Sequence, residues 1–163
     1  MENVIQLKKR NTLSFEIVDE NGNKTGETLE FDLEDIELPL KYQECLDKHT
    51  RNKQSLDMQF IAIDKKQDVT NGKDKGTKIL TRNEVEKYEV LKEYYKREME
   101  ALDLFLGKDG CKKLLNGREP YYSMFDDIND VIEPILPKLK VHAEDIINRV
   151  KEKYNKKEDN VLE

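Results

Sequence analysis

Hydrophobic and polar side chains alternate in two segments near the start of the chain. Apolar side chains occupy every second position of residues 12–18 (TLSFEIV) and again of residues 27–33 (ETLEFDL). A period of two is typical of half-buried β-strands. The connecting residues 19–26 (DENGNKTG) contain an Asn-Gly step, which readily adopts the positive φ of a tight turn. The pattern predicts an antiparallel β-hairpin, whose apolar face must rest on helices or on another chain.

Beyond the predicted hairpin the period of the pattern changes from two to between three and four. Apolar residues recur at helical spacing from Pro39 to Ile63, and proline is tolerated in the first turn of a helix. Residues 50–55 are polar throughout. We predict one long helix over residues 39–63, with a break at the polar stretch as the alternative.

Residues 81–84 (TRNE) have the form of a capping box, in which threonine and glutamate side chains bind free backbone amides. Apolar residues then follow at gaps of three and four as far as Leu106, and Gly107 is a natural helix stop. Asp109 is expected to cap a short helix, which Asn116 and Gly117 end. The sequence thus predicts a long helix followed by a short one.

Two further helices are predicted after Pro120. The first covers apolar positions from Tyr122 to Ile132, and Pro134 and Pro137 end or kink it. The last helix carries an apolar stripe made of Leu139, Ala143, Ile146, Val150 and Tyr154. Residues 155–163 (NKKEDNVLE) are polar and are predicted to form a disordered tail.

These elements predict a mainly α fold with an N-terminal β-hairpin followed by four or five helices. Residues 64–78 are charged, contain two glycines and almost no apolar side chains, which favours a flexible linker. The linker would separate the hairpin and long helix of residues 1–63 from a C-terminal helical bundle of residues 79–154. At 163 residues, we expect one domain overall.

Composition narrows the classes of partner. Charged residues make up 39% of the chain and the net charge is −6, so the surface repels a phosphate backbone and nucleic acid is an unlikely partner. Two short basic clusters are interpreted as solvated ends, although they leave open a small nucleic-acid-binding regulator: Lys8, Lys9, Arg10; Lys151, Lys153, Lys156, Lys157. No apolar stretch approaches the roughly 20 residues of a membrane span. Two cysteines give no disulfide framework, so a reducing cytoplasm is expected.

No motif in the chain predicts catalysis or a cofactor. There is no G-x-S-x-G motif and no phosphate-binding P-loop, so we expect a non-enzyme without cofactor. Cys45 and His49 are four residues apart, a spacing that suits two zinc ligands on a helix, and Cys111 and His142 could complete the set. We favour a buried free cysteine beside a histidine at the edge of the core.

Apolar side chains between residues 102 and 125 are crowded beyond a single helical stripe. Such crowding is typical of a helix buried on two sides, and the second side can be a partner chain. An entirely intramolecular core is the alternative. The predicted partner-binding residues are Leu104, Phe105, Leu114, Leu115, Tyr122 and Phe125.

Residues 101–134 (ALDLFLGKDGCKKLLNGREPYYSMFDDINDVIEP) resemble the C-terminal part of the tail assembly chaperones of long-tailed bacteriophages that infect Gram-positive bacteria. The shared order is a helix ending in a glycine turn, a short helix ending in apolar residues, an Asn-Gly turn and another amphipathic helix. It is carried here by Leu106-Gly107, Gly110, Leu114-Leu115, Asn116-Gly117 and the stretch 125–132.

The resemblance implies a non-catalytic role in the host cytoplasm. Proteins of that family bind the long, aggregation-prone tape measure protein, help to recruit tail tube subunits and leave before the virion is complete. The alternative is a structural tail component or self-associating subunit retained in the particle, whose hairpin adds strands to a neighbour's sheet edge. A homo-oligomer is therefore also compatible with the sequence.

Overall fold

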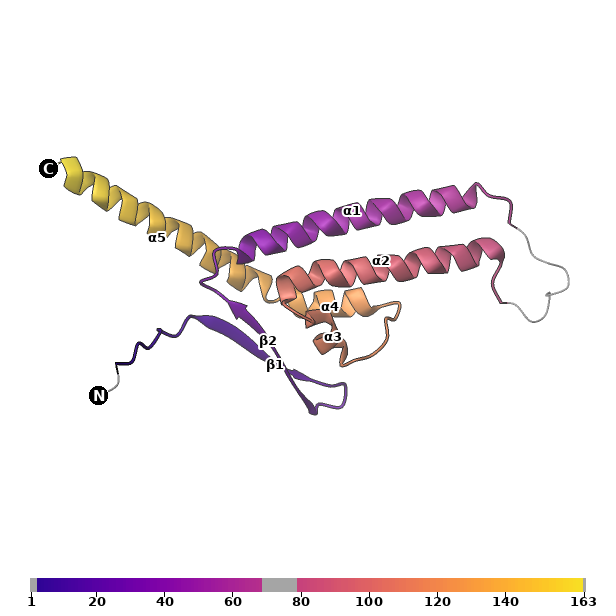
Figure 1. Ribbon diagram of the computed structural model, residues 1–163, viewed down its shortest axis with the longest axis horizontal. Helices are drawn as coiled ribbons and strands as arrows, with labels where there is room; N and C mark the ends of the chain where they lie inside the picture. Colours follow the sequence, from indigo (N-terminus) through magenta and orange to yellow (C-terminus); the bar gives the residue numbers. More distant parts are fainter. Residues whose placement is uncertain (1–2, 69–78, 163) are drawn as a thin grey trace. The chain divides into compact units, whose positions relative to one another are not determined.

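The computed structural model describes the backbone of residues 3–68 and 79–162, with side chains described through residue 155. The predicted β-hairpin is present, formed by β1 (Thr12–Val18) and β2 (Lys24–Asp32) in antiparallel register (Figure 1). Phe15 lies opposite Leu29, which puts the alternating apolar side chains of both strands on one face. Strand β2 begins before the predicted residue 27, because Lys24 pairs with Val18 beyond an irregularity in the register.

Helix α1 (Leu38–Asp64) is continuous through the polar stretch 50–55, so the prediction of one long helix is confirmed. Solvated side chains do not break a helix when no glycine or proline is present. Helix α2 (Arg82–Leu106) begins with the predicted capping box. The Thr81 amide donates to Glu84 Oε1 and the Glu84 amide donates to Thr81 Oγ1, both at 3.2 Å. Gly107 follows with a φ of 93°.

The short helix α3 (Gly110–Leu115) ends at Asn116 in the left-handed conformation, as predicted. Asp109 occupies the N-cap position, but its side chain makes no capping hydrogen bond, so that part of the prediction is wrong. With a φ of 57°, its backbone is left-handed, unlike the extended conformation of a usual N-cap. Helix α4 (Met124–Ile132) then ends before Pro134.

Helix α5 (Leu136–Leu162) replaces the disordered tail that the sequence predicts from residue 155. Lysine and glutamate have good helix propensity, and no glycine or proline follows Pro137, so the helix has no local reason to stop. The fold is therefore mainly helical, with an N-terminal hairpin followed by five helices in the described residues. Residues 69–78, most of the predicted linker, lie outside the described residues.

The chain forms two compact units that do not follow the predicted division at residues 64–78. One unit joins residues 1–41 to residues 106–163, and the other contains residues 42–105. The composition of the connecting segment suggested a boundary there, but α1 and α2 pair with each other, so the segment links two helices of one unit. The hairpin instead packs with α3, which comes much later in the chain.

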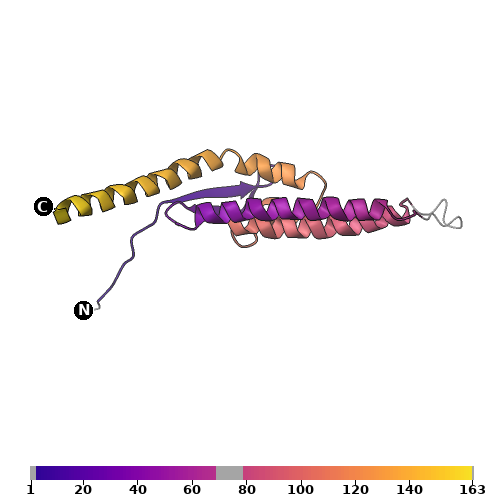
Figure 2. The ribbon, with the colours of Figure 1, turned by 90° about the horizontal axis from the view of Figure 1, so that it is seen from above.

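The first unit, residues 1–41 with 106–163, has an apolar core under the inner face of the hairpin. Phe31 and Leu29 contribute the buried residues of β2, and Phe15 meets Phe31 edge to face at 6.3 Å between ring centroids. Figure 2 shows a strand of the hairpin beside the first turns of α5. The helices contribute a set of buried residues: Cys111, Leu115, Met124, Ile128, Ile132 and Ile135.

The second unit, residues 42–105, is an antiparallel helical hairpin. Contacts pair the start of α1 with the end of α2, where Tyr42 lies edge to face against Phe105. Further along the pair, Lys87 of α2 lies over the Phe60 ring of α1. At the far end, the Asn83 side-chain amide donates to the carbonyl oxygens of Ile63 and Lys66, at 3.2 and 3.0 Å. This amide satisfies carbonyls that the end of α1 leaves without an intrahelical partner.

Candidate interaction surfaces

The six predicted partner-binding residues divide between the two units. Leu104 is half-buried and Phe105 is buried in the helical hairpin. In the other unit, Leu115 is buried, Leu114 and Phe125 are half-buried, and Tyr122 is exposed. Phe105 and Leu115 are thus core residues and present no surface to a partner. The six residues do not all belong to one unit, and only Leu114 contributes to one of the surfaces described next.

The outer half of α5 carries an exposed apolar stripe. Ile147, Val150 and Tyr154 are 56%, 46% and 65% exposed. They continue the line of Leu139, Ala143 and Ile146, which are half-buried. At 3.6 residues per turn the six fall within an arc of about 100° of the helix, along about 22 Å at 1.5 Å per residue. We call these six residues the α5 stripe. It contains the five residues of the stripe that the sequence predicts for the last helix, and Ile147 in addition.

The remaining faces of α5 are mainly charged or polar. Arg149 pairs with Asp145 one turn away, with 2.9 Å between Nε and Oδ2. Val141 is the large apolar exception, 67% exposed, and a helix period of 3.6 residues puts it on the side opposite the stripe. A helix of this type is amphipathic, and the apolar residues Ile147, Val150 and Tyr154 of its outer half are exposed.

A second apolar surface lies in the unit formed by residues 1–41 and 106–163. It is a shallow groove of about 360 Å³ beside β1, lined by Phe15, Ile17, Leu114, Val131 and Ile135, with Glu16 and Lys138 among its polar residues. The strand supplies one wall, and α3 and the α4–α5 corner supply the other. Its lining is mostly hydrocarbon, which suits a side chain of another polypeptide better than a charged small molecule.

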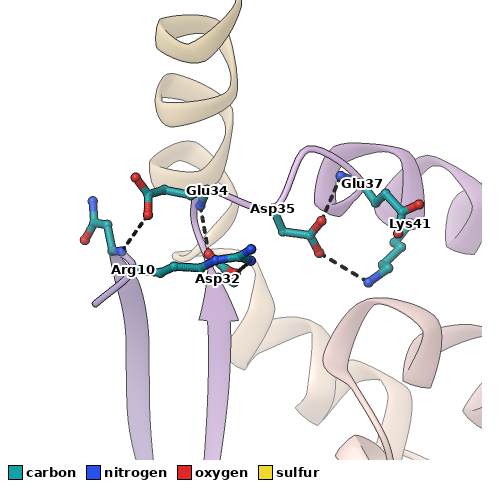
Figure 3. Close-up of polar contacts among 7 residues, drawn as sticks. Arg10, Asp32, Glu34, Asp35, Glu37 and Lys41 are labelled. Carbon is teal, nitrogen blue, oxygen red and sulfur yellow. Dashed lines mark hydrogen bonds and ion pairs between the residues drawn. The ribbon is translucent and has the colours of Figure 1, made fainter. Parts of the chain in front are cut away.

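A cluster of polar side chains lies where β1 begins, β2 ends and α1 starts (Figure 3). Arg10 pairs with Asp32 at 2.5 Å, and the Asn11 amide donates to Glu34. Asp35 accepts from the Glu37 amide and from Lys41. The side-chain hydrogen bond from Arg10 lowers the pKa of Asp32, and the Glu37 amide lowers that of Asp35. These carboxylates fix the turn into α1 and have their partners within the chain.

The thiol and imidazole that suggested a metal site have structural partners instead. Cys45 is buried, and desolvation together with the charge of Glu98 raises its pKa to about 11. His49 Nδ1 lies 2.6 Å from Glu98 Oε2, and the Asn52 amide donates to Glu98 Oε1 at 2.9 Å. Cys111 lies in the other unit. Within the described residues, no three side chains of the types His, Cys, Asp and Glu are grouped to hold a metal.

Comparisons with known proteins identify no relative of this chain. No protein-family model matches the sequence, no curated protein matches it, and no solved structure matches the fold. Within the described residues, no helix is both long enough and apolar enough to cross a membrane. The inference of function therefore rests on the surfaces described above and on the resemblance of residues 101–134.

Two surface features were missed as candidate sites from the sequence. The α5 stripe was recognised as a helix face, but periodicity alone does not say whether a face is covered. The apolar residues of the N-terminal segment, Val4, Ile5 and Leu7, precede the predicted strand and belong to no predicted element. Their signal was present, since Ile5 and Leu7 share the odd-numbered phase of Leu13, Phe15 and Ile17.

Proposed function

We propose that this protein is a non-catalytic phage tail morphogenesis protein that binds the tape measure protein in the host cytoplasm as a tail assembly chaperone. Its partner-binding surface is the α5 stripe, which receives an amphipathic helical segment of the tape measure protein. The protein keeps that long protein soluble and helps to recruit tail tube subunits. It needs no cofactor and acts by binding alone.

The observation that carries this proposal is the exposure of Ile147, Val150 and Tyr154 along one face of α5. Apolar side chains at helical spacing are the usual means by which one helix binds another, because each pair of faces removes hydrocarbon from water. A tyrosine at the end of such a stripe adds a large side chain of the kind that dominates binding energy at interfaces. The choice of the tape measure protein as partner comes from the resemblance of residues 101–134.

The first test is a tagged pull-down of the full chain from phage-producing host cells, with mass spectrometry of the proteins that copurify. We expect recovery of a very long helical protein, and we expect the tagged chain to be absent from finished particles. Presence of the chain in finished particles would contradict the chaperone role and favour the structural tail component. Recovery of the tagged chain by itself would also contradict it.

Two substitutions on α5 test whether the tape measure protein binds to the α5 stripe. Val150→Glu places a charge within the stripe, and we expect it to abolish recovery of the tape measure protein. Val141→Glu places the same charge on the opposite face, at a residue that is at least as exposed, and we expect normal recovery. Equal loss of recovery in both variants would mean that the stripe is not the binding surface.

A further inference from the structure

The residues before β1 form an apolar arm that leaves the fold. Residues 3–9 have no helix or strand assignment, and Figure 1 shows them running away from the start of β1 as an extended trace. Val4, Ile5 and Leu7 are 80%, 92% and 87% exposed. Large apolar side chains seldom remain this exposed on adjacent residues without a binding role, because water contact is unfavourable for each of them.

The base of this arm is held in place. Arg10 is tied to Asp32, and the Asn11 amide donates to Glu34 Oε2 at 3.1 Å (Figure 3). The Leu33 amide donates to the carbonyl oxygen of Asn11 at 2.9 Å, which continues the hairpin ladder to that residue. These contacts direct the arm away from the groove, whose β1 wall is Phe15–Val18 at the other end of the strand. The arm would have to reverse to reach its own groove.

The outer edge of β1 is open to another strand. The described sheet contains β1 and β2 alone, so β1 has a neighbour on one side. The carbonyl oxygens of Asn11 and Ile17 accept bonds from the β2 side. Because backbone groups alternate along a strand, those of Thr12 and Ser14 point to the outer edge. An edge with unpaired backbone groups is a template for a strand from another chain.

We propose that two copies of this chain associate through their β1 edges and exchange their N-terminal arms. The two β1 strands pair antiparallel about a two-fold axis near Thr12 and form a four-stranded sheet. The arm of each copy then runs beside the groove-lining half of the other copy's β1. A two-fold contact uses the same surface on both copies, so the association closes at a dimer.

The chemistry of the arm fits this register. With the axis at Thr12, Leu7 lies opposite Ile17 of the other copy. Both residues are odd-numbered, and the odd-numbered apolar side chains of β1 face the groove side of the sheet. The same register places Lys8 opposite Glu16, whose carboxylate also pairs with Lys24 of its own chain at 3.3 Å. Opposite charges directly across two strands are favourable. The alternation of apolar side chains and the pairing of opposite charges therefore both favour the register with its axis at Thr12.

Leu7→Asp tests the proposal, with Val4→Asp as the matched control on the same arm. The measurement is the mass of the full-length protein by sedimentation velocity, over the micromolar range. We expect a wild-type dimer, a dissociation constant at least about tenfold higher for Leu7→Asp, and a near wild-type constant for Val4→Asp, whose side chain has the other phase. A wild-type monomer throughout that range, or equal weakening by both variants, would overturn the arm exchange.

A second variant tests the strand edge independently of the arm. Ser14→Pro removes an outward backbone amide without removing a hydrogen bond to β2, and we expect it to abolish the dimer. Far-UV circular dichroism checks that the variant still folds. If Ser14→Pro is folded and still dimeric, the β1 edge is not the contact. The variant Val150→Glu should leave the dimer unchanged, so failure of the dimer and failure of tape measure binding are separate results.

Discussion

The two units of this protein are held together in different ways. The unit that contains the β-hairpin buries apolar side chains almost completely, with Phe31, Leu115, Met124 and Ile128 among its least exposed residues. The helical hairpin of residues 42–105 has fewer buried apolar residues and instead buries two polar ones, Asn83 and Glu98. Burial of apolar side chains stabilises a fold but depends little on the orientation of the groups. Hydrogen bonds between specific side chains fix which turn of one helix faces which turn of the other.

The consequence is a difference in how each unit should respond to substitution. In the β-hairpin unit, the loss of volume should matter most, because the surrounding side chains are closely packed. In the helical hairpin, the loss of one polar partner should matter more than the loss of an apolar side chain on its surface. Paired substitutions can test that contrast.

The largest expected effect is a comparison of two methionines. Met124 is 0% exposed in the β-hairpin unit and Met58 is 72% exposed on α1. Met124→Ala should lower the free energy of unfolding by about 2–5 kcal/mol, because it leaves a cavity. Met58→Ala should change it by less than about 0.5 kcal/mol. Urea unfolding followed by circular dichroism measures both. Similar losses for the two variants would contradict the assignment of the core.

A smaller effect is expected from Glu98→Ala in the helical hairpin. The substitution leaves His49 and Asn52 without their carboxylate partner and should lower the free energy of unfolding by about 1–3 kcal/mol. Glu93→Ala is the control on the same helix, because its carboxylate makes an exposed i,i+4 pair with Arg97 that is worth about 0.5 kcal/mol or less. Equal effects would show that Glu98 does not hold the two helices in register.

The capping box gives an intermediate test of the start of α2. Thr81→Ala removes the hydroxyl that accepts from the Glu84 amide and should cost about 1 kcal/mol. Thr50→Ala is the control, since its hydroxyl bonds to the Leu46 carbonyl within α1, where replacement by alanine is close to neutral. Thermal unfolding of the two variants distinguishes a cap from an ordinary helix hydroxyl.

The remaining effect develops only at alkaline pH. The thiol of Cys45 has its pKa raised from 9.0 to about 11 by burial, so the folded state retains a proton that the unfolded state loses. This contribution is fully present below pH 9 and is lost as the pH rises from 9 toward 11. We expect wild-type stability to fall faster over that range than the stability of Cys45→Ala. Parallel pH profiles would mean that the thiol ionises equally in both states.

The sequence predicted the local elements well, because their signals are local. The alternation in β1, the capping box at Thr81 and the stop at Gly107 each depend on side chains within a few residues. The division into units was not predictable in this way. It depends on which elements contact each other, and the contact of Asn83 with Ile63 or of α3 with β2 joins residues far apart in sequence.

The candidate surfaces show the same limit. The density of apolar side chains beyond one stripe predicts a partner surface at Leu104, Phe105, Leu114, Leu115, Tyr122 and Phe125, yet density does not distinguish core from surface. Phe105 and Leu115 complete the core, whereas the exposed residues of α5 have an ordinary spacing. Periodicity identifies a face, and the three-dimensional arrangement decides what covers it.

The most direct test of the central proposal is coexpression of this protein with the tape measure protein, measuring how much of the latter stays soluble. We predict that the wild type and Val141→Glu keep it soluble and that Val150→Glu does not. If Val150→Glu is folded and protects the tape measure protein as well as the wild type does, the α5 stripe is not its binding surface. If the wild type gives no protection, the protein is not its chaperone.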